Sequence, residues 1–439
     1  MMRVSIIVSV ILAGLLSCSM VAPATAQGVE PASNDGERSG LSSDPDDPGN
    51  LLVDIRQRGM QRESLLPVSP LVGLNDFTTQ AKDRLYEATG IRLGLAIDHL
   101  FQGLSRALPD EAHRGTTTDL DFIGAWELID RGRPTSGQVY VGVEGRWDYG
   151  TTGPQTLGFS SLASAGGTAN TFSAYTPTFI VRNLYWQHGS EEAGWTYRIG
   201  KITPDQILDS SAHISPTTTF LPNIGTVTLA NALPDSGLGI AGAWFIGDRA
   251  YLAGLASDAN GDRFDFGDIG AGDFYKAAEL GVKIAPVTPK AGYSKVTLWH
   301  NDGTKDGRPS NGSAGKKGWG VFVKYEQELS ADGRAVGVFR WGRSFDESAL
   351  YEQGAGASFL LYDPLDLVGI TNDLFGVAFN WVKSSIIGAR DEYNAEVFYR
   401  FPIFPLVDMT LSYQSVIDPA FNPDFDHASA FSMRLRTTF

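Results

Sequence analysis

The last nine residues of the chain, 431–439, most restrict the fold, because apolar and polar side chains alternate there without a break. The apolar members share one parity and the polar members share the other: Phe431, Met433, Leu435 and Phe439 against Ser432, Arg434, Arg436 and Thr438. In a strand, successive side chains point to opposite faces, so one face is apolar and the other cationic. An alternating strand that ends in an aromatic residue is typical of the last strand of an outer-membrane barrel, and a soluble β-protein is the competing interpretation.

The same period of two recurs from Ile91 onward in sixteen segments, each long enough to cross a bilayer as a tilted strand. These segments are 91–100, 119–128, 137–147, 177–187, 194–202, 236–246, 249–257, 275–285, 293–300, 317–328, 334–343, 354–362, 373–383, 391–400, 406–416 and 428–439. We therefore predict an all-β fold, a transmembrane antiparallel β-barrel of about sixteen strands over 91–439, preceded by a short N-terminal periplasmic helix.

The connections between these segments alternate between short turns and longer loops, with both chain ends on the side of the short turns. This asymmetry is typical of bacterial outer-membrane barrels and predicts periplasmic termini. A barrel of this size leaves a water-filled lumen. The loops after the first, third and fifth segments are candidates for a constriction. The second of them, 148–176, is rich in Gly, Ser and Thr, and the third, 203–235, contains four prolines. Inward folding and surface decoration both remain open for them.

The N-terminal region reads as targeting and leader sequence. Residues 1–26 have the basic, apolar and small-residue regions of a secretory signal peptide, and a lipoprotein signal with Cys18 as the lipidated residue is the alternative. The acidic stretch 27–75 is predicted to be a largely disordered leader. A helix is predicted over 76–90, with Asp76 as its N-cap and Gly90 after its last turn.

Bulk properties exclude several classes of function. The net charge of −15 argues against nucleic acid as a partner. After the N-terminus, no run of apolar residues is long enough for a membrane-spanning helix. The six His are scattered, and no HExxH, G-x-S-x-G or P-loop pattern is present. We therefore expect no enzymatic activity, no metal and no cofactor.

The inward face of the predicted barrel is where the chemistry of a channel would lie. Taking the apolar parity as lipid-facing, we predict these pore-lining or substrate-binding residues: Arg92, Tyr140, Glu144, Arg146, Arg198, Glu279, Lys283, Lys324, Glu326, Arg340, Glu396, Arg400, Arg434 and Arg436. Charges of both signs on one wall suit neutral polyhydroxyl solutes, and Tyr140 could stack on a sugar ring. For any single residue, a solvated group paired with a cross-strand neighbour is the simpler interpretation.

Aromatic residues near segment ends suggest the girdles of a membrane barrel. They are Trp147, Tyr149, Trp186, Trp195, Tyr197, Trp299, Trp341, Trp381 and Phe439. Because aromatic residues favour strands in any β-protein, this pattern adds modest support.

Several spaced motifs resemble the carbohydrate-selective porins of the bacterial outer membrane, the glucose-porin (OprB-like) family. The motifs are Leu85-Tyr-Glu-Ala-Thr-Gly90-Ile-Arg-Leu-Gly94, Arg198-Ile-Gly-Lys201 with Pro204-Asp205, Glu396-Val-Phe-Tyr-Arg400, and Leu411-Ser-Tyr-Gln414-Ser-Val-Ile417-Asp-Pro419. Ser412 and Asp418-Pro419-Ala420 depart from the family pattern. The resemblance implies passive sugar diffusion, with Arg92, Glu144 and Arg146 narrowing the pore.

The sequence thus predicts a Gram-negative outer-membrane porin for small carbohydrates. Its expected partners are outer-membrane lipids and the barrel assembly machinery, which would read the strand ending at Phe439. A general or ion-selective porin is the first alternative. An outer-membrane enzyme such as a lipase would need a nucleophile and a base on one lipid-facing patch, and the outward parities show almost no Ser–His pairing. A soluble β-rich binding protein is the remaining alternative.

Overall fold

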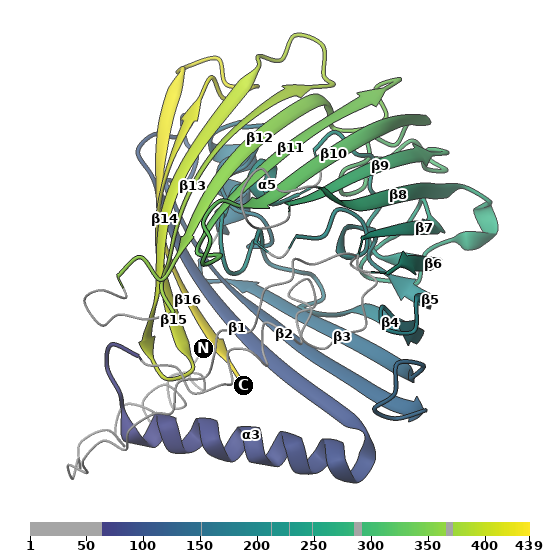
Figure 1. Cartoon of the computed structure of the whole chain (residues 1–439). Helices are drawn as coiled ribbons and strands as arrows, with labels where there is room; N and C mark the ends of the chain where they lie inside the picture. The colour runs from purple at the N-terminus through teal and green to yellow at the C-terminus, as the bar shows by residue number, and fades with distance from the viewer. Residues whose placement is uncertain are drawn as a thin grey trace. The chain divides into compact units, whose positions relative to one another are not determined.

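The computed structural model describes residues 64–439 except 151, 212, 228, 248, 285–291 and 366–371. The predicted signal peptide, Cys18 and most of the acidic leader lie outside the described residues. Sixteen strands form one closed antiparallel barrel in which each strand pairs with its neighbours along the chain and β16 pairs with β1 (Figure 1). The predicted fold class is therefore confirmed.

Every strand overlaps one predicted segment. The strands are β1 (Ile91–Leu104), β2 (Arg114–Ile129), β3 (Gly137–Asp148), β4 (Phe179–Ser190), β5 (Trp195–Ile202), β6 (Gly237–Ile246), β7 (Ala250–Asp258), β8 (Phe274–Ile284), β9 (Gly292–Asn301), β10 (Gly318–Glu328), β11 (Ala335–Phe345), β12 (Tyr351–Tyr362), β13 (Leu374–Ser384), β14 (Glu392–Phe404), β15 (Val407–Ile417) and β16 (His427–Thr438). The first hairpin is longer than predicted, because its ladder continues as far as the pair Gly103 and Arg114.

The helix α3 (Ser69–Thr89) lies across the end of the barrel where the short turns are (Figure 1). It begins earlier than predicted, with Pro in its first turn and without a side-chain cap, so Asp76 lies inside the helix. Its C-terminal end is as predicted: Gly90 is left-handed (φ 76°) and its N–H bonds the Tyr86 carbonyl. The Trp126 indole donates to the Thr89 carbonyl at 3.1 Å and ties the helix to β2. Within the described part of the chain, no helix is long and apolar enough to cross a membrane.

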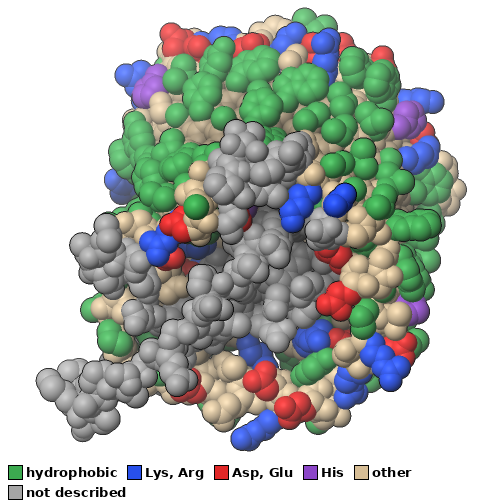
Figure 2. Space-filling model, viewed as in Figure 1, with side chains coloured by type: hydrophobic (Ala, Val, Ile, Leu, Met, Phe, Trp, Pro, Cys, Tyr) green, Lys and Arg blue, Asp and Glu red, His purple; other side chains and the backbone are tan. Residues whose placement is uncertain are grey.

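The two faces of the barrel wall differ in chemistry. Alternate residues of each strand are exposed and largely apolar, such as Leu280 (46% exposed) and Phe431 (59%). Figure 2 shows hydrophobic side chains covering the outer surface, in the part of the view where Figure 1 places β10 to β13, with charged side chains along its upper edge. One girdle assignment is wrong: Trp299 lies on the inward parity of β9 and is 3% exposed.

The two longest loops contain short helical elements and fold into the barrel interior. They are α4 (Pro154–Thr156) and η1 (Leu157–Ser161) in the first, and η2 (Pro204–Gln206) and α5 (Asn223–Thr226) in the second. A further turn, η3 (Ile269–Ala271), follows β7. Figure 1 places α5 inside the ring of strands, and Leu157 and Ile224 are fully buried. We call residues 149–178 the first inward loop and residues 203–236 the second inward loop.

We predict that Leu280→Arg lowers the free energy of unfolding in a phospholipid bilayer by about 2–4 kcal/mol, because it places a cation at mid-strand on the lipid-facing side. The matched control is Phe264→Arg, at a site of similar exposure (47% against 46%) in the loop after β7. Urea unfolding of the refolded protein in vesicles measures both variants. Equal costs at the two sites would contradict a lipid-facing outer surface.

Candidate functional site

All fourteen inward residues predicted from the sequence lie on the parity opposite to the exposed apolar side chains of their strands. Arg92, Lys283 and Arg400 are half-buried and the others are buried. Their role in lining a pore or binding a substrate stays a prediction. The structure shows in addition what many of them contact.

Strands β8 to β10 hold the start of the second inward loop with charged side chains. The Lys324 ammonium pairs with the Asp209 carboxylate at 2.8 Å and donates to the Ser210 carbonyl at 2.9 Å. Lys295, on the neighbouring strand, donates to the same Ser210 carbonyl at 2.7 Å. Glu279 accepts the Asp209 backbone N–H at 2.7 Å. Two cations and one anion of the wall thus hold two consecutive loop residues.

Strand β11 holds the end of the loop around α5. The Arg340 guanidinium donates to the carbonyl oxygens of Ile224 and Val227, both at 3.0 Å. The loop then passes so close to the wall that a Cβ added at Gly342 would collide with the Leu229 carbonyl. Only a residue without a side chain allows this approach. Arg340 and Gly342, two residues apart on one face, therefore fix this part of the loop against the wall.

Strands β14 and β16 hold the middle of the loop. Glu396 accepts the Leu221 backbone N–H at 3.0 Å, and Arg434 donates to the Thr219 carbonyl at 3.0 Å. Arg400 donates at 3.0 Å to the loop carbonyl that precedes Thr219. All three residues were predicted on the inner face from the alternation of their strands.

These contacts have one physical cause. A loop inside a barrel has no ladder partner for its backbone N–H and carbonyl groups, and a buried group left unpaired is costly. Charged side chains make stronger hydrogen bonds than neutral ones and satisfy these groups from the wall. Several wall charges predicted to be cross-strand pairs or free pore groups are therefore anchors of the second inward loop.

The first inward loop is anchored by an acidic side chain of β14. The Glu392 carboxylate accepts from the Ser164 hydroxyl at 2.6 Å and from the Ala165 backbone N–H at 2.7 Å. The two inward loops also touch each other, because Phe172 and Leu221 belong to one buried apolar cluster. They therefore form a single body inside the barrel.

Charges of both signs meet on β2 to β4. Arg146 pairs with Asp119 at 3.0 Å and with Glu144 at 3.1 Å. Tyr175 of the first inward loop donates to Glu144 at 3.0 Å and lies with its ring 4.5 Å from the Arg146 guanidinium. A second guanidinium, that of Arg182, lies 3.4 Å from Glu144. Asp119 and Glu144 thus each have a guanidinium beside them, and the charges of these two acids and of Arg146 and Arg182 cancel.

Four charged wall residues of these networks were not predicted from the sequence. Arg182 is missed because the pairing shifts at Gly142 in β3, and a bulge there changes which residues of β4 face inward. Asp119, Lys295 and Glu392 follow the parity of predicted neighbours and could have been found by extending it. The contacts of Lys295 and Glu392 with loop residues distant in sequence leave no local signal.

Arg92 does not join the residues with which it was predicted to narrow the pore. Glu144 and Arg146 are in contact, whereas Arg92 pairs with Glu127 at 2.5 Å and stacks on the ring of Tyr86 at 4.2 Å. Tyr86 belongs to α3, so Arg92 links the helix to the end of the barrel. In this structure Arg92 therefore connects α3 to the barrel wall.

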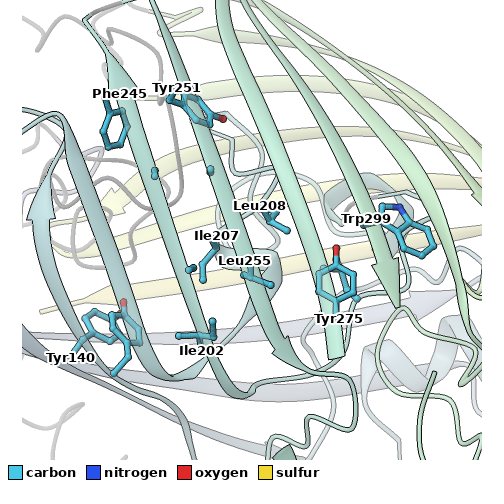
Figure 3. Packing of buried hydrophobic residues seen from close by; sticks show 14 of the residues in the cluster. Tyr140, Ile202, Ile207, Leu208, Phe245, Tyr251, Leu255, Tyr275 and Trp299 are labelled. Atoms are coloured by element: carbon cyan, nitrogen blue, oxygen red, sulfur yellow. The ribbon is translucent and has the colours of Figure 1, made fainter. Parts of the chain in front are cut away.

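Tyr140 has one ring face covered. Its ring stacks on Tyr185 with centroids 4.7 Å apart and planes at 9°, and Arg198 lies 5.1 Å over Tyr185 while donating to Gln187 at 2.8 Å. Figure 3 shows Tyr140 beside Ile202 among the buried residues. A sugar could stack only on the uncovered part of the ring.

The outer face contains hydroxyl–histidine contacts of a kind that the sequence pattern led us not to expect. The Thr118 hydroxyl and the His99 Nδ1 are 2.8 Å apart on β2 and β1. The Ser415 hydroxyl and the His427 Nε2 are 2.9 Å apart on β15 and β16. Among the described residues, no hydrogen bond orients the other His427 nitrogen, so the pair lacks the third member of a catalytic triad. No group of three His, Cys, Asp or Glu that could hold a metal ion occurs in the part of the chain that the structure describes.

Burial and charge act in opposite directions on the acidic groups of the second inward loop. Burial raises the pKa of Asp209 to about 6, although the Lys324 ammonium beside it acts to lower it. Burial acts to raise the pKa of Asp235 too, but the guanidiniums of Arg182 and Arg263 outweigh it and lower that pKa.

The fold is similar to that of solved porins. The high-pH structure of Pseudomonas putida OprB matches with a TM-score of 0.67 at 10% identity, over 82% of this chain and 97% of that one. Its low-pH structure matches with a TM-score of 0.53 at 11% identity, over 82% and 96%. A mutant of the Rh. blastica porin matches at 0.48 and 10% identity, over 80% and 100%. No protein-family model and no curated protein sequence matches the chain.

We predict that Asp209→Asn removes a pH dependence of stability. The raised pKa means that the folded state binds a proton that the unfolded state, with the ordinary value of 3.8, does not. The wild type should therefore gain stability relative to the variant as the pH falls from 7 through 6, by up to about 3 kcal/mol near pH 4. Urea unfolding at several pH values measures the difference, with the exposed Asp306→Asn as control; a flat difference would contradict it.

We predict that Arg340→Met releases the second inward loop, because it leaves two carbonyl oxygens without donors at a cost of about 1–3 kcal/mol each. Single-channel conductance should change and protease should cleave within 203–236 more readily. Gly342→Val should act in the same direction from the same strand, while the outward-facing Phe339→Leu serves as control. Unchanged conductance and protection in both inward variants would refute the anchoring role.

Proposed function

We propose that this chain is an outer-membrane porin through which small carbohydrates diffuse passively. The observation that carries the proposal is a closed sixteen-stranded barrel with an apolar outer face and a charged inner face, narrowed by two loops fixed to its wall. An apolar outer band suits a bilayer, and closure leaves no unpaired strand edge within it. Polar inner walls suit the passage of water-soluble molecules.

The pairing of charges favours neutral solutes over ions of one sign. Arg146 is neutralised by Asp119 and Glu144, and the same holds for Lys324 with Asp209. A wall of closely spaced opposite charges has a small net field but many hydrogen-bond donors and acceptors. Hydroxyl groups of a sugar can both donate and accept there.

Two further observations support the carbohydrate class. The fold is shared with OprB, and the spaced sequence motifs resemble the carbohydrate-selective porins. Arg198, Glu396 and Arg400, which belong to those motifs, lie on the inner face or against the second inward loop. The motif positions thus coincide with the interior of the barrel.

The proposal includes the outer membrane of a Gram-negative bacterium as the location, with periplasmic termini. Membrane lipids and the barrel assembly machinery are the proposed partners. The last strand supports the barrel assembly machinery as a partner. Beyond β16, the backbone of Phe439 completes the seam with Leu95 through bonds of 2.8 and 3.1 Å, so the chain end is part of barrel closure. A terminal strand of this kind is a suitable signal for assembly.

A general or ion-selective porin is the second candidate, because the same architecture would serve it. An outer-membrane enzyme is less well supported. Ser415 and His427 supply a nucleophile and a base on the outer face, yet among the described residues no third group orients the base.

Liposome swelling with refolded protein tests the proposal, comparing glucose, a disaccharide and gluconate. We expect fast glucose entry and slow gluconate entry. In Glu144→Gln, which leaves Arg146 and Arg182 less neutralised, we expect faster gluconate entry with little change for glucose. The exposed Glu347→Gln removes the same charge as a control. Equal rates for all solutes in the wild type would favour a general porin, and no swelling would refute an open channel.

A further inference from the structure

At the loop end of β11, β12 and β13, three rows of the outer face have one smaller residue between two larger ones. The pairing of the three strands defines these rows. Counted along the strands, starting at the loop end, they are Arg343–Gln353–Lys383, Trp341–Ala355–Trp381 and Phe339–Ala357–Phe379. The next row, Gly337–Phe359–Val377, has the large residue in the middle and closes the pattern. The middle member of each row belongs to β12. Its two alanines form the floor of a groove, which we call the outer groove, with aromatic side chains on both sides and two cations at its end.

We propose that the outer groove binds one phosphate-bearing lipid of the surrounding membrane. An acyl chain would lie along Ala355 and Ala357, and the phosphate would lie between Arg343 and Lys383. The inference rests on the proposed function only in that the outer face lies in a lipid bilayer.

The dimensions of the outer groove suit an extended alkyl chain. Neighbouring strands lie about 4.8 Å apart, so β11 and β13 are about 10 Å apart across β12. Phe339 and Phe379 are 48% and 51% exposed, and Ala357 is exposed between them, so the rings leave the floor uncovered. Trp341 and Trp381 come next toward the loops, the depth at which Trp residues of membrane proteins meet the lipid headgroups.

A cleft of about 430 Å³ continues the groove at its cationic end, and its lining includes Arg343, Glu352 and Lys383. Arg343 is exposed and has no carboxylate partner among the described residues. Lys383 pairs with Glu352 at 2.7 Å, but these side chains are 46% and 39% exposed, so the pair is weak and can exchange for another anion. The cleft thus offers an unpaired guanidinium beside a loosely held ammonium.

Apolar side chains flank the same cleft. Ile386 and Ile387 line it and are 60% and 92% exposed. Large exposed apolar groups next to cations match the boundary between acyl chains and phosphate headgroups, where each group finds its own environment.

Some other cations at this end of the barrel are already bound within the protein. Arg390 pairs with Asp426 at 2.5 Å and Asp418 at 3.3 Å, and Lys316 pairs with Glu347 at 2.6 Å. Arg106, Arg114 and Lys317, like Arg343, have no carboxylate partner among the described residues, but of these four only Arg343 lines the cleft. Its planar fork binds phosphate oxygens through two parallel hydrogen bonds.

A lipid fits this surface better than a second copy of the chain. A stable protein interface buries about 800 Å² on each partner, whereas the groove is one strand wide and bordered by projecting rings. The cleft also includes Asp346 and Glu347, of which Glu347 is held by Lys316.

Native mass spectrometry of the delipidated full chain, titrated with phosphatidylglycerol, diacylglycerol or inorganic phosphate, tests the proposal. We expect one tightly held phosphatidylglycerol in the wild type and about tenfold weaker retention in the double variant Arg343→Gln with Lys383→Gln. Lys305→Gln with Lys317→Gln removes the same charge from exposed positions at the same end, outside the cleft lining, and should retain the lipid. Ala355→Trp should abolish retention by filling the groove while keeping both cations.

Several results would overturn the proposal. Equal loss in the two double variants would mean attraction by charge alone, and equal retention of diacylglycerol would remove the role of the phosphate. Competition by inorganic phosphate at the same concentration would indicate a free-anion site, and loss of an oligomer in Ala355→Trp with lipid retained would indicate a second copy. Glucose swelling of the same preparations keeps the outcomes separate: intact swelling with failed lipid retention refutes only the outer groove.

Discussion

The structure depends on the pairing of its last strand with its first. Within a hydrocarbon layer, every backbone N–H and carbonyl needs a partner, and a sheet achieves this only by closing on itself. Here β16 and β1 pair from Leu104 to Ala96, and an Arg436–Asp98 ion pair lies directly across this seam with both side chains buried. Closure divides every strand into an outward and an inward set of side chains. The apolar band, the charged wall and the enclosed loops all follow from that division.

Closure also explains why so many wall charges are anchors. The inward loops bring irregular backbone into an enclosed space, and their unpaired groups must be satisfied from the wall. Arg340 and Glu396 do this from strands distant in sequence from the loop that they hold. In the channel that we propose, charged hydrogen bonds hold the inward loops in place, and the pairing of those charges leaves a weak net field for passing solutes.

The side chains on the outer face of the barrel are not the same over the whole surface. Over most of the surface, exposed apolar residues such as Leu280 and Leu298 present an even surface to lipid. At the loop end of β11 to β13, two alanines between aromatic side chains and the uncompensated Arg343 create a local site. The barrel can thus combine a general affinity for lipid with one specific contact, because both faces of a strand are chosen independently.

The sequence by itself determined the sixteen strands, their inward and outward parity and the helix end at Gly90, because these depend on periodicity and turn chemistry within short stretches. It also indicated which loops were long enough to fold inward. Only the tertiary structure decided that they do so, that Lys324 meets Asp209, that Arg92 joins α3 instead of Glu144, and that Arg182 turns inward at a bulge. These contacts link residues far apart in the chain, and barrel closure, which no local pattern encodes, sets which of them meet.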